Sequence, residues 1–328
     1  MADRRRWVSP SSLGLLVAFV LAVAVPFVAE KYYIDLVARI MILSVFALSL
    51  QLLVGQTGLV SFGHAAFFGI AAYATALLSP QSGPGSMWIL LPAALGAAGL
   101  YALAVGALSL RTRGVYFIMV TLAFAQMAYY IFHDTAAGGG SDGIYLYFRP
   151  TLSIAGMQLL DLDRPRLFYF FILAALVLTF TLLSVLRASR FGRALAGIRV
   201  NEQRMRAAGF ATYPYKLAAF VVAAMLAGVA GFLYALKDGY VNPEILSWHQ
   251  SGAVLLMLIL GGISSLRGAV IGAIAFIALQ ELYQSQAIFG AWAKHWQLPL
   301  GLTIIVLVAL LPRGLIGLGA RLRSSKSA

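Results

Sequence analysis

The chain has 328 residues, of which 61% are hydrophobic and only 11% are charged, and its formal net charge is +13. Because soluble globular proteins carry about 25% charged residues, this composition excludes an ordinary soluble protein. The positive charge would suit nucleic acid, but the basic residues lie mainly in short segments between long apolar runs, as in cytoplasmic loops of membrane proteins. We therefore expect membrane lipid around the chain and no nucleic-acid partner.

Apolar runs predict an all-α polytopic membrane protein with eight to ten transmembrane helices in a single domain, 1–328. The first run follows Arg4–Arg6 and resembles a signal peptide, but it continues to Ala29, so we expect a retained first span. The run 64–79 is short and rich in glycine, which leaves a full span or a re-entrant segment open. The ten runs cover 12–29, 36–54, 64–79, 87–110, 114–132, 167–186, 217–236, 251–266, 268–286 and 297–311.

The distribution of basic residues predicts that both termini are cytoplasmic. If Arg4–Arg6 are inside and the spans alternate, 17 of the 24 Lys and Arg residues fall on the cytoplasmic side. The five tryptophans all lie at run ends, where an indole prefers the membrane interface.

The segment 55–64 interrupts two apolar runs with three glycines and several hydrogen-bonding side chains. Broken helix inside a membrane is tolerated where protein or a water-filled cavity satisfies the backbone, and transporters place such breaks near their translocation path. Path contact is one interpretation, and a cytoplasmic turn followed by close helix packing is the other. For His64 we favour a structural hydrogen bond over a proton relay. The polar side chains of this break are Gln56, Thr57, Ser61 and His64.

A second glycine-rich stretch, 138–143, lies in a long segment, 133–166, that the topology places outside. It suits a lid or a contact for an outside partner, and equally a plain flexible loop. A third such stretch, 261–268, separates two adjacent runs, and we expect its small residues to serve close helix packing.

The cytoplasmic segment 187–216 is strongly basic, with seven Lys or Arg and a single acid, Glu202. Asn201 can cap a helix and Gly209 can end it, which predicts a short helix between them. Glu202 can pair with Arg199 or Arg206 on its surface. We interpret this loop as a docking surface for another protein. No GK[ST] triplet exists in the chain, so that partner would have to supply any ATP hydrolysis.

Five motifs in order resemble the inner-membrane permeases of branched-chain amino-acid ABC importers, in particular their LivM-like half. Any one match is weak, but together they cover most of the chain from residue 36 onward. Two departures are Arg204-Met205-Arg206, where smaller or acidic residues are expected, and Arg267, where a Gly-Pro is expected before Ala269. The motifs are GQTGLVSFGHAAFFGIAAY (55–73), GVYFIMVTLAFAQM (114–127), GGSDGI (139–144), GRALAGIRVNEQRMRAAGF (192–210) and LGGISSLRGAVIGA (260–273).

The resemblance implies a bacterial inner-membrane heterodimer with a LivH-like permease, two cytoplasmic ABC ATPase subunits and a periplasmic solute-binding protein. It implies ATP-driven import of leucine, isoleucine, valine or a related solute, with urea, amides or other amino acids as alternatives. ATP and Mg would bind the partner subunits, and no cofactor or metal is expected on this chain.

The resemblance also assigns roles to individual residues. ATPase coupling falls to Arg193, Gly197, Arg199, Asn201, Glu202, Arg206 and Gly209. Candidates for the translocation path are Gln56, Thr57, Ser61, His64 and Thr121. Candidates for docking of the binding protein are Gly139, Ser141, Asp142 and Gly143.

Two other classes of protein fit the sequence less well. An ion-coupled secondary transporter usually needs ionisable groups within the membrane, and Glu281 is the main acid away from a run end. A membrane-embedded enzyme needs clustered acid, His or Ser groups, and the sequence has no such cluster.

Overall fold

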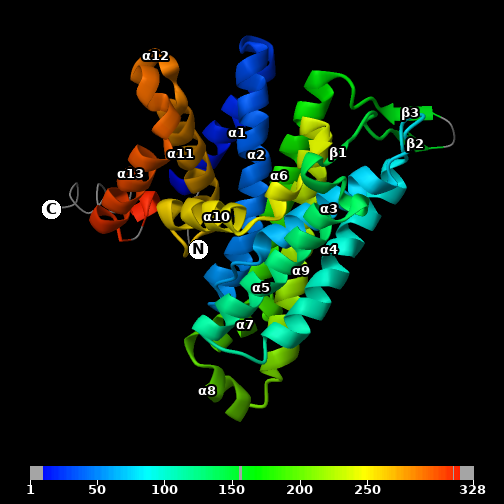
Figure 1. Ribbon diagram of the computed structural model, residues 1–328. Helices are drawn as coiled ribbons and strands as arrows, with labels where there is room; N and C mark the ends of the chain where they lie inside the picture. Colours follow the sequence, from blue (N-terminus) through cyan, green and yellow to red (C-terminus); the bar gives the residue numbers. More distant parts are fainter. Residues whose placement is uncertain (1–9, 155–156, 313, 318–328) are drawn as a thin grey trace, which may run out of the picture.

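The protein is described here by a computed structural model that places residues 10–154, 157–312 and 314–317, and most of them are helical. Long helices form a bundle and short elements connect their ends (Figure 1). The α-helices are α1 (Pro10–Val28), α2 (Lys31–Gln51), α3 (His64–Leu78), α4 (Met87–Ser109), α5 (Val115–Asp134), α6 (Pro165–Ala188), α7 (Arg190–Val200), α8 (Glu202–Ala207), α9 (Thr212–Asp238), α10 (Trp248–Gly261), α11 (Leu266–Gln284), α12 (Gln286–Phe289) and α13 (Gln297–Leu310).

The remaining elements are short. A π-helix, η1 (Leu52–Thr57), continues α2 without interruption. The 3₁₀ turns are η2 (Ala136–Gly138), η3 (Gly140–Asp142), η4 (Pro243–Leu246) and η5 (Gly290–His295), and the strands are β1 (Ile144–Tyr145), β2 (Leu152–Ile154), β3 (Met157–Leu160) and β4 (Tyr240–Val241).

The predicted membrane architecture is confirmed. Within the described residues, seven helices are long and apolar enough to cross a membrane. Three more apolar helices are shorter: Phe19–Val28 of α1, α3 and α10. Each of the ten predicted runs corresponds to one of these helices. At 15 residues, α3 is about 22 Å long, which is less than the roughly 30 Å of a bilayer core.

The predicted run 251–266 is longer than the helix found there. α10 ends at Gly261, and Gly262 takes a positive φ of 114°. Ser265 then accepts a hydrogen bond from the backbone N–H of Gly268 at 3.0 Å and so begins α11. Hydropathy alone does not detect this turn, because its residues are small rather than charged.

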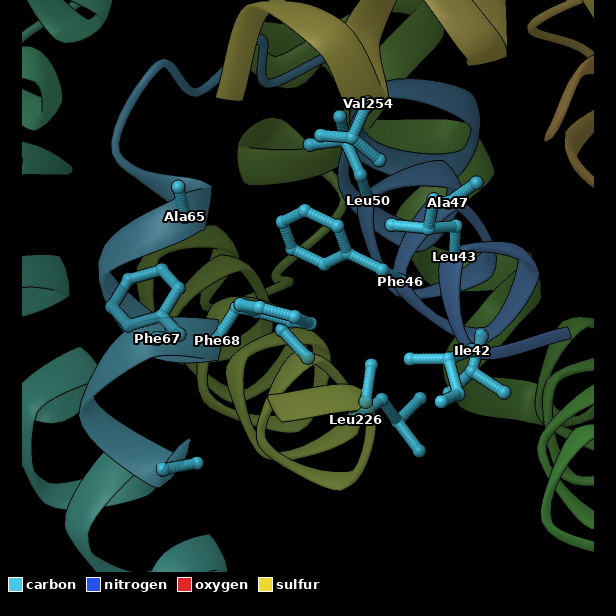
Figure 2. Close-up of a cluster of buried hydrophobic side chains, with 14 of the residues drawn as sticks. Ile42, Leu43, Phe46, Ala47, Leu50, Ala65, Phe67, Phe68, Leu226 and Val254 are labelled. Atoms are coloured by element: carbon cyan, nitrogen blue, oxygen red, sulfur yellow. The ribbon is translucent and has the colours of Figure 1, made fainter. Parts of the chain in front are cut away.

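The core lies where α2, α3, α9 and α10 meet (Figure 2). Phe46 of α2 and Phe68 of α3 are fully buried, and their ring centroids are 4.7 Å apart. α3 also packs on α4 and α5. Glycine allows the tightest contact, since a Cβ at Gly231 of α9 would lie 1.9 Å from the carbonyl oxygen of Phe68. Such small residues let membrane helices approach closely.

The segment 133–166 is more ordered than a plain loop. β1 pairs antiparallel with β4, so that Ile144 faces Val241, and β2 pairs with β3 in a hairpin. The segment is therefore attached to the end of α9.

The short basic helices α7 and α8 lie together at the bottom of Figure 1. We call this end of the bundle the α8 end. α9 leads from it towards the β1–β4 pair, which belongs to the opposite end together with α12.

Candidate functional site

Two motifs that are distant in sequence meet at the π-helix η1. The side-chain amide of Gln51, at the end of α2, donates to the backbone carbonyl of Ile263 at 3.4 Å. A Cβ at Gly55 would lie 2.8 Å from the same carbonyl oxygen. The glycine-rich break at 55–64 therefore packs directly on the turn between α10 and α11.

A third motif reaches η1 through Arg199 of α7. Its guanidinium donates to the backbone carbonyl of Gly55, and a Cβ at Gly58 would lie 3.3 Å from its Cγ. Gly58 ends η1 with a φ of 74°, a left-handed conformation that glycine adopts at little cost. Arg199 therefore bonds to the break rather than to Glu202. Its role in docking a partner stays a prediction.

A fourth motif contributes Thr121. A Cβ at Gly63 would lie 2.4 Å from the Thr121 carbonyl oxygen, so α5 crosses the break at backbone contact. The Thr121 hydroxyl donates to Ile118 within its own helix at 2.9 Å. Thus four of the five motifs converge around η1, although they are spread over more than 200 residues.

The polar side chains of the break are buried and mostly bonded locally. His64 is fully buried; its Nε2 is 2.8 Å from the Ser49 hydroxyl, and its ring stacks on Phe46. Thr57 donates to the Leu53 carbonyl at 2.6 Å, and Ser61 accepts from the backbone N–H of Gly63 at 3.2 Å. The His64 contacts agree with the predicted structural hydrogen bond. A path role for these residues and for Gln56, which is also buried, stays a prediction.

The short helix predicted between Asn201 and Gly209 is present as α8. The Asn201 side chain accepts from the backbone N–H of Arg204 at 2.9 Å, which is an N-cap. At the other end Gly209 has a φ of +86°. The backbone N–H of Gly209 donates to the Arg206 carbonyl, and the backbone N–H of Phe210 donates to the Met205 carbonyl. This is the hydrogen-bond pattern of a Schellman motif.

Glu202 connects α8 to α9. Its carboxylate accepts from Lys216 Nζ at 2.9 Å, from Arg206 Nη2 at 2.6 Å and from the Thr212 hydroxyl at 3.0 Å. Burial raises the pKa of Glu202, but the hydrogen bonds from Lys216, Thr212 and Arg206 and the charge of Lys216 outweigh it, so the pKa falls to about 2. Lys216 is itself buried, with its side chain 7% exposed. The sequence indicated the Arg206 pair but not Lys216, which lies 14 residues away.

We predict that acid releases α8 from α9. The pKa of Glu202 lies below its ordinary value of 4.5, so its stabilising effect is complete above about pH 4.5 and is lost as the pH falls through about 2. Hydrogen exchange of 202–216, corrected for intrinsic rates, should rise over this interval. A Glu202→Gln variant should exchange rapidly at pH 7 and lack the added pH dependence. An equal pH dependence in both proteins would contradict the assignment.

The other predicted coupling residues take different positions. Arg193 donates to the Ala188 carbonyl at 2.6 Å and so binds the end of α6. A Cβ at Gly197 would lie 2.8 Å from the Met205 sulfur, which allows α8 to pack on α7. Leu195 and Ile198 are buried. Arg204 is exposed, and among the described residues its guanidinium has no ion-pair partner. Arg204 and Arg206 both depart from the family pattern, and Arg204 is the more available of the two for contact with a partner.

The glycine stretch at the opposite end is held in turns. Gly139 and Gly143 both have φ near +70°, and a Cβ at Gly143 would lie 2.2 Å from the Val241 carbonyl oxygen. Ser141 donates to the Asp142 carboxylate at 3.2 Å, and the Tyr240 hydroxyl donates to the Asp142 carbonyl at 2.7 Å. Docking of a binding protein here stays a prediction.

Sequence reasoning missed a cavity of about 470 Å³ towards the same end, between α2, α9 and the η4–α10 segment. No motif marks it, because its residues come from three segments that are far apart in the sequence. Its lining residues are Arg39, Ile42, Leu43, Tyr234, Lys237, Asp238, Asn242, Glu244, Ile245 and Gln250.

Comparison with known proteins extends the match well beyond the motifs. The family model described as "Branched-chain amino acid transport system / permease component" matches residues 32–311, from α2 to just beyond α13. The high-affinity branched-chain amino acid transport system permease protein LivM of Escherichia coli (strain K12) is 31% identical over 327 residues, which cover 93% of this chain and 74% of that protein. LivM of Salmonella typhimurium (strain LT2) is 30% identical with the same coverage. No solved structure matches this chain significantly.

Proposed function

Because this chain belongs to the family of permease components of branched-chain amino acid transport systems, we propose that it carries leucine, isoleucine, valine or a closely related solute in an ATP-driven importer. It is a multi-pass membrane subunit of a transport complex rather than an enzyme. The two relatives are named as high-affinity branched-chain amino acid permeases, which supports this solute class.

The observation that carries the mechanism is the double attachment of the α7–α8 segment. At one point Glu202 bonds to Lys216 and Thr212 in the first turns of α9. At the other, Arg199 bonds to Gly55 in the break that follows α2. A force applied to α8 therefore reaches both helices through short polar contacts. Because α2 and α9 also pack on each other, a rigid-body shift of the segment would tilt them together.

In this proposal α8 is the coupling helix, the α8 end is cytoplasmic, and both termini are cytoplasmic as well. Two ABC ATPase subunits bind ATP and Mg and close against α8, and their closure switches the path between outward- and inward-facing states. Arg204 is exposed on α8 and is available to contact an ATPase. A LivH-like permease completes the path, and a periplasmic binding protein delivers the solute to the opposite end.

An ion-driven mechanism has less support. Glu281, the acid that favoured it, is occupied by contacts with other residues of the chain. It accepts from the Tyr32 hydroxyl at 2.8 Å and lies 3.8 Å from Arg39. A carboxylate held in this way is a poor site for a coupling ion.

Uptake into proteoliposomes tests the function. The chain is reconstituted with its permease and ATPase partners and the binding protein encoded beside it. We expect leucine uptake that depends on ATP at the cytoplasmic face and persists when a protonophore collapses the proton gradient. Uptake that needs the proton gradient and not ATP would contradict an ABC importer. Uptake of urea or an amide in place of leucine would contradict the solute class alone.

A further inference from the structure

The cavity between α2, α9 and the η4–α10 segment contains both signs of charge in balance. Arg39 and Lys237 carry two positive charges, and Asp238 and Glu244 carry two negative charges, so the formal charges of the lining cancel. A neutral lining of this kind gives no net attraction for a simple ion. It suits a ligand that itself carries one charge of each sign.

The same cavity has an aliphatic side. Ile42 and Leu43 of α2 and Ile245 of η4 are each buried in the core and contribute to the lining. At about 470 Å³ the cavity falls within the range of small-molecule sites, about 300–1,000 Å³. Such sites combine an apolar wall with a few placed polar groups, and this cavity has both.

Two of the charged groups can act on a ligand. Within the part of the chain that the structure describes, the Glu244 carboxylate accepts from the Tyr129 hydroxyl and forms no ion pair. A carboxylate has about four lone-pair sites, so it can still accept from an ammonium group. Arg39 lies 3.8 Å from Glu281, and its side chain is 40% exposed. That loose pair leaves donors of the guanidinium available for a carboxylate. Lys237 and Asp238, by contrast, satisfy each other at 2.9 Å.

We propose that this cavity is a binding site for a zwitterionic aliphatic α-amino acid, with Glu244 facing its ammonium, Arg39 its carboxylate, and Ile42, Leu43 and Ile245 its side chain. The inference rests on the proposed function, since it gives the transported solute class a site on this chain. The site lies towards the end opposite α8, where the solute would arrive. It is distinct from the break around η1, whose polar residues do not line the cavity.

The absence of cysteine from the chain permits a direct test. Asn242→Cys places a single thiol in the cavity lining, and Gln81→Cys places one in a separate cavity at the same end as a matched control. The reconstituted complex is labelled with a membrane-impermeant methanethiosulfonate, without binding protein. Millimolar leucine should slow labelling at position 242 at least five-fold and leave position 81 unchanged. Two analogues should not slow labelling at position 242: 4-methylpentanoate, which lacks the ammonium, and 3-methylbutylamine, which lacks the carboxylate.

Substitution of the two charged residues supplies the second readout. Arg39→Gln and Glu244→Gln should each abolish protection by leucine of the thiol at position 242, whereas Lys31→Gln and Glu30→Gln, at the same end but outside the cavity, should retain it. Three results would overturn the site. Leucine could protect position 242 equally in all four variants, it could protect in none of them, or position 242 could fail to label while position 81 reacts. If wild-type complex shows ATP-driven leucine uptake in those cases, only this inference fails. If it shows none, the proposed function fails first.

Discussion

Replacing Glu202 by alanine is expected to lower ATP-driven uptake at least ten-fold. The variant removes three hydrogen bonds that join Glu202 to α8 and to the start of α9. It also leaves the Lys216 ammonium buried without its carboxylate. Breaking a fully buried pair costs about 3–5 kcal/mol, and the cost here should be smaller because the Glu202 side chain is 22% exposed. α8 should therefore separate from α9 while the spans stay folded. Uptake, ATPase copurification and hydrogen exchange of 202–216 measure the effect.

A double variant distinguishes loss of the α8–α9 contact from unfolding of the start of α9. Glu202→Ala with Lys216→Met removes both charges, and apolar replacement of a buried ion pair is often nearly neutral for stability. We expect exchange at 212–220 to return to the wild-type rate while uptake stays low, because α8 is still unattached. Glu30→Ala, an exposed acid at the other end, is the control for removal of a glutamate. Normal uptake by the single variant would mean that α8 is not the coupling element.

Replacing Gly231 by valine is expected to prevent assembly of the bundle. A Cβ at this position would lie 1.9 Å from the backbone oxygen of Phe68, and a backbone atom cannot move aside as a side-chain tip can. α3 and α9 would have to separate along their contact. Overpacking costs typically about 1–3 kcal/mol, and a clash with backbone belongs at or above the upper end of that range. The yield of monodisperse protein in detergent and its thermal midpoint measure the loss.

Gly252→Val is the matched control for this substitution. Gly252 also lies within an apolar helix, α10, but a Cβ there would meet nothing within 4 Å. Both variants therefore exchange helical glycine for the same β-branched residue, and only one meets a neighbour. We expect the Gly252 variant to lie within a few degrees of wild type. Similar midpoints for the two variants would show that the α3–α9 contact is not limiting for stability.

Much of the architecture could be predicted from the sequence. Each apolar run corresponds to a helix, because lipid imposes one requirement on every spanning segment: sufficient apolar length with internal backbone hydrogen bonds. The ends of α8 were predictable for a similar reason. The Asn201 cap and the Gly209 stop act on backbone groups within five residues, so their partners are fixed by the local chain.

Contacts between distant segments followed no such rule. Glu202 was one expected partner of Arg199, yet Arg199 bonds to Gly55, 144 residues away. Glu202 was expected to pair with Arg199 or Arg206. It pairs with Arg206, but its most buried partner is Lys216. In each case a backbone carbonyl or a buried charge from another segment binds the side chain.

The sequence by itself determined the class of the molecule, its helices and the caps of its basic segment, because hydropathy and capping depend on residues close together in the chain. Only the tertiary structure decided that four motifs converge on η1 and that Arg39 and Glu244 share one cavity. The physical reason is the packing of α2, α9 and α10. Which polar groups face one another depends on the rotation and register of these helices, and hydropathy encodes neither.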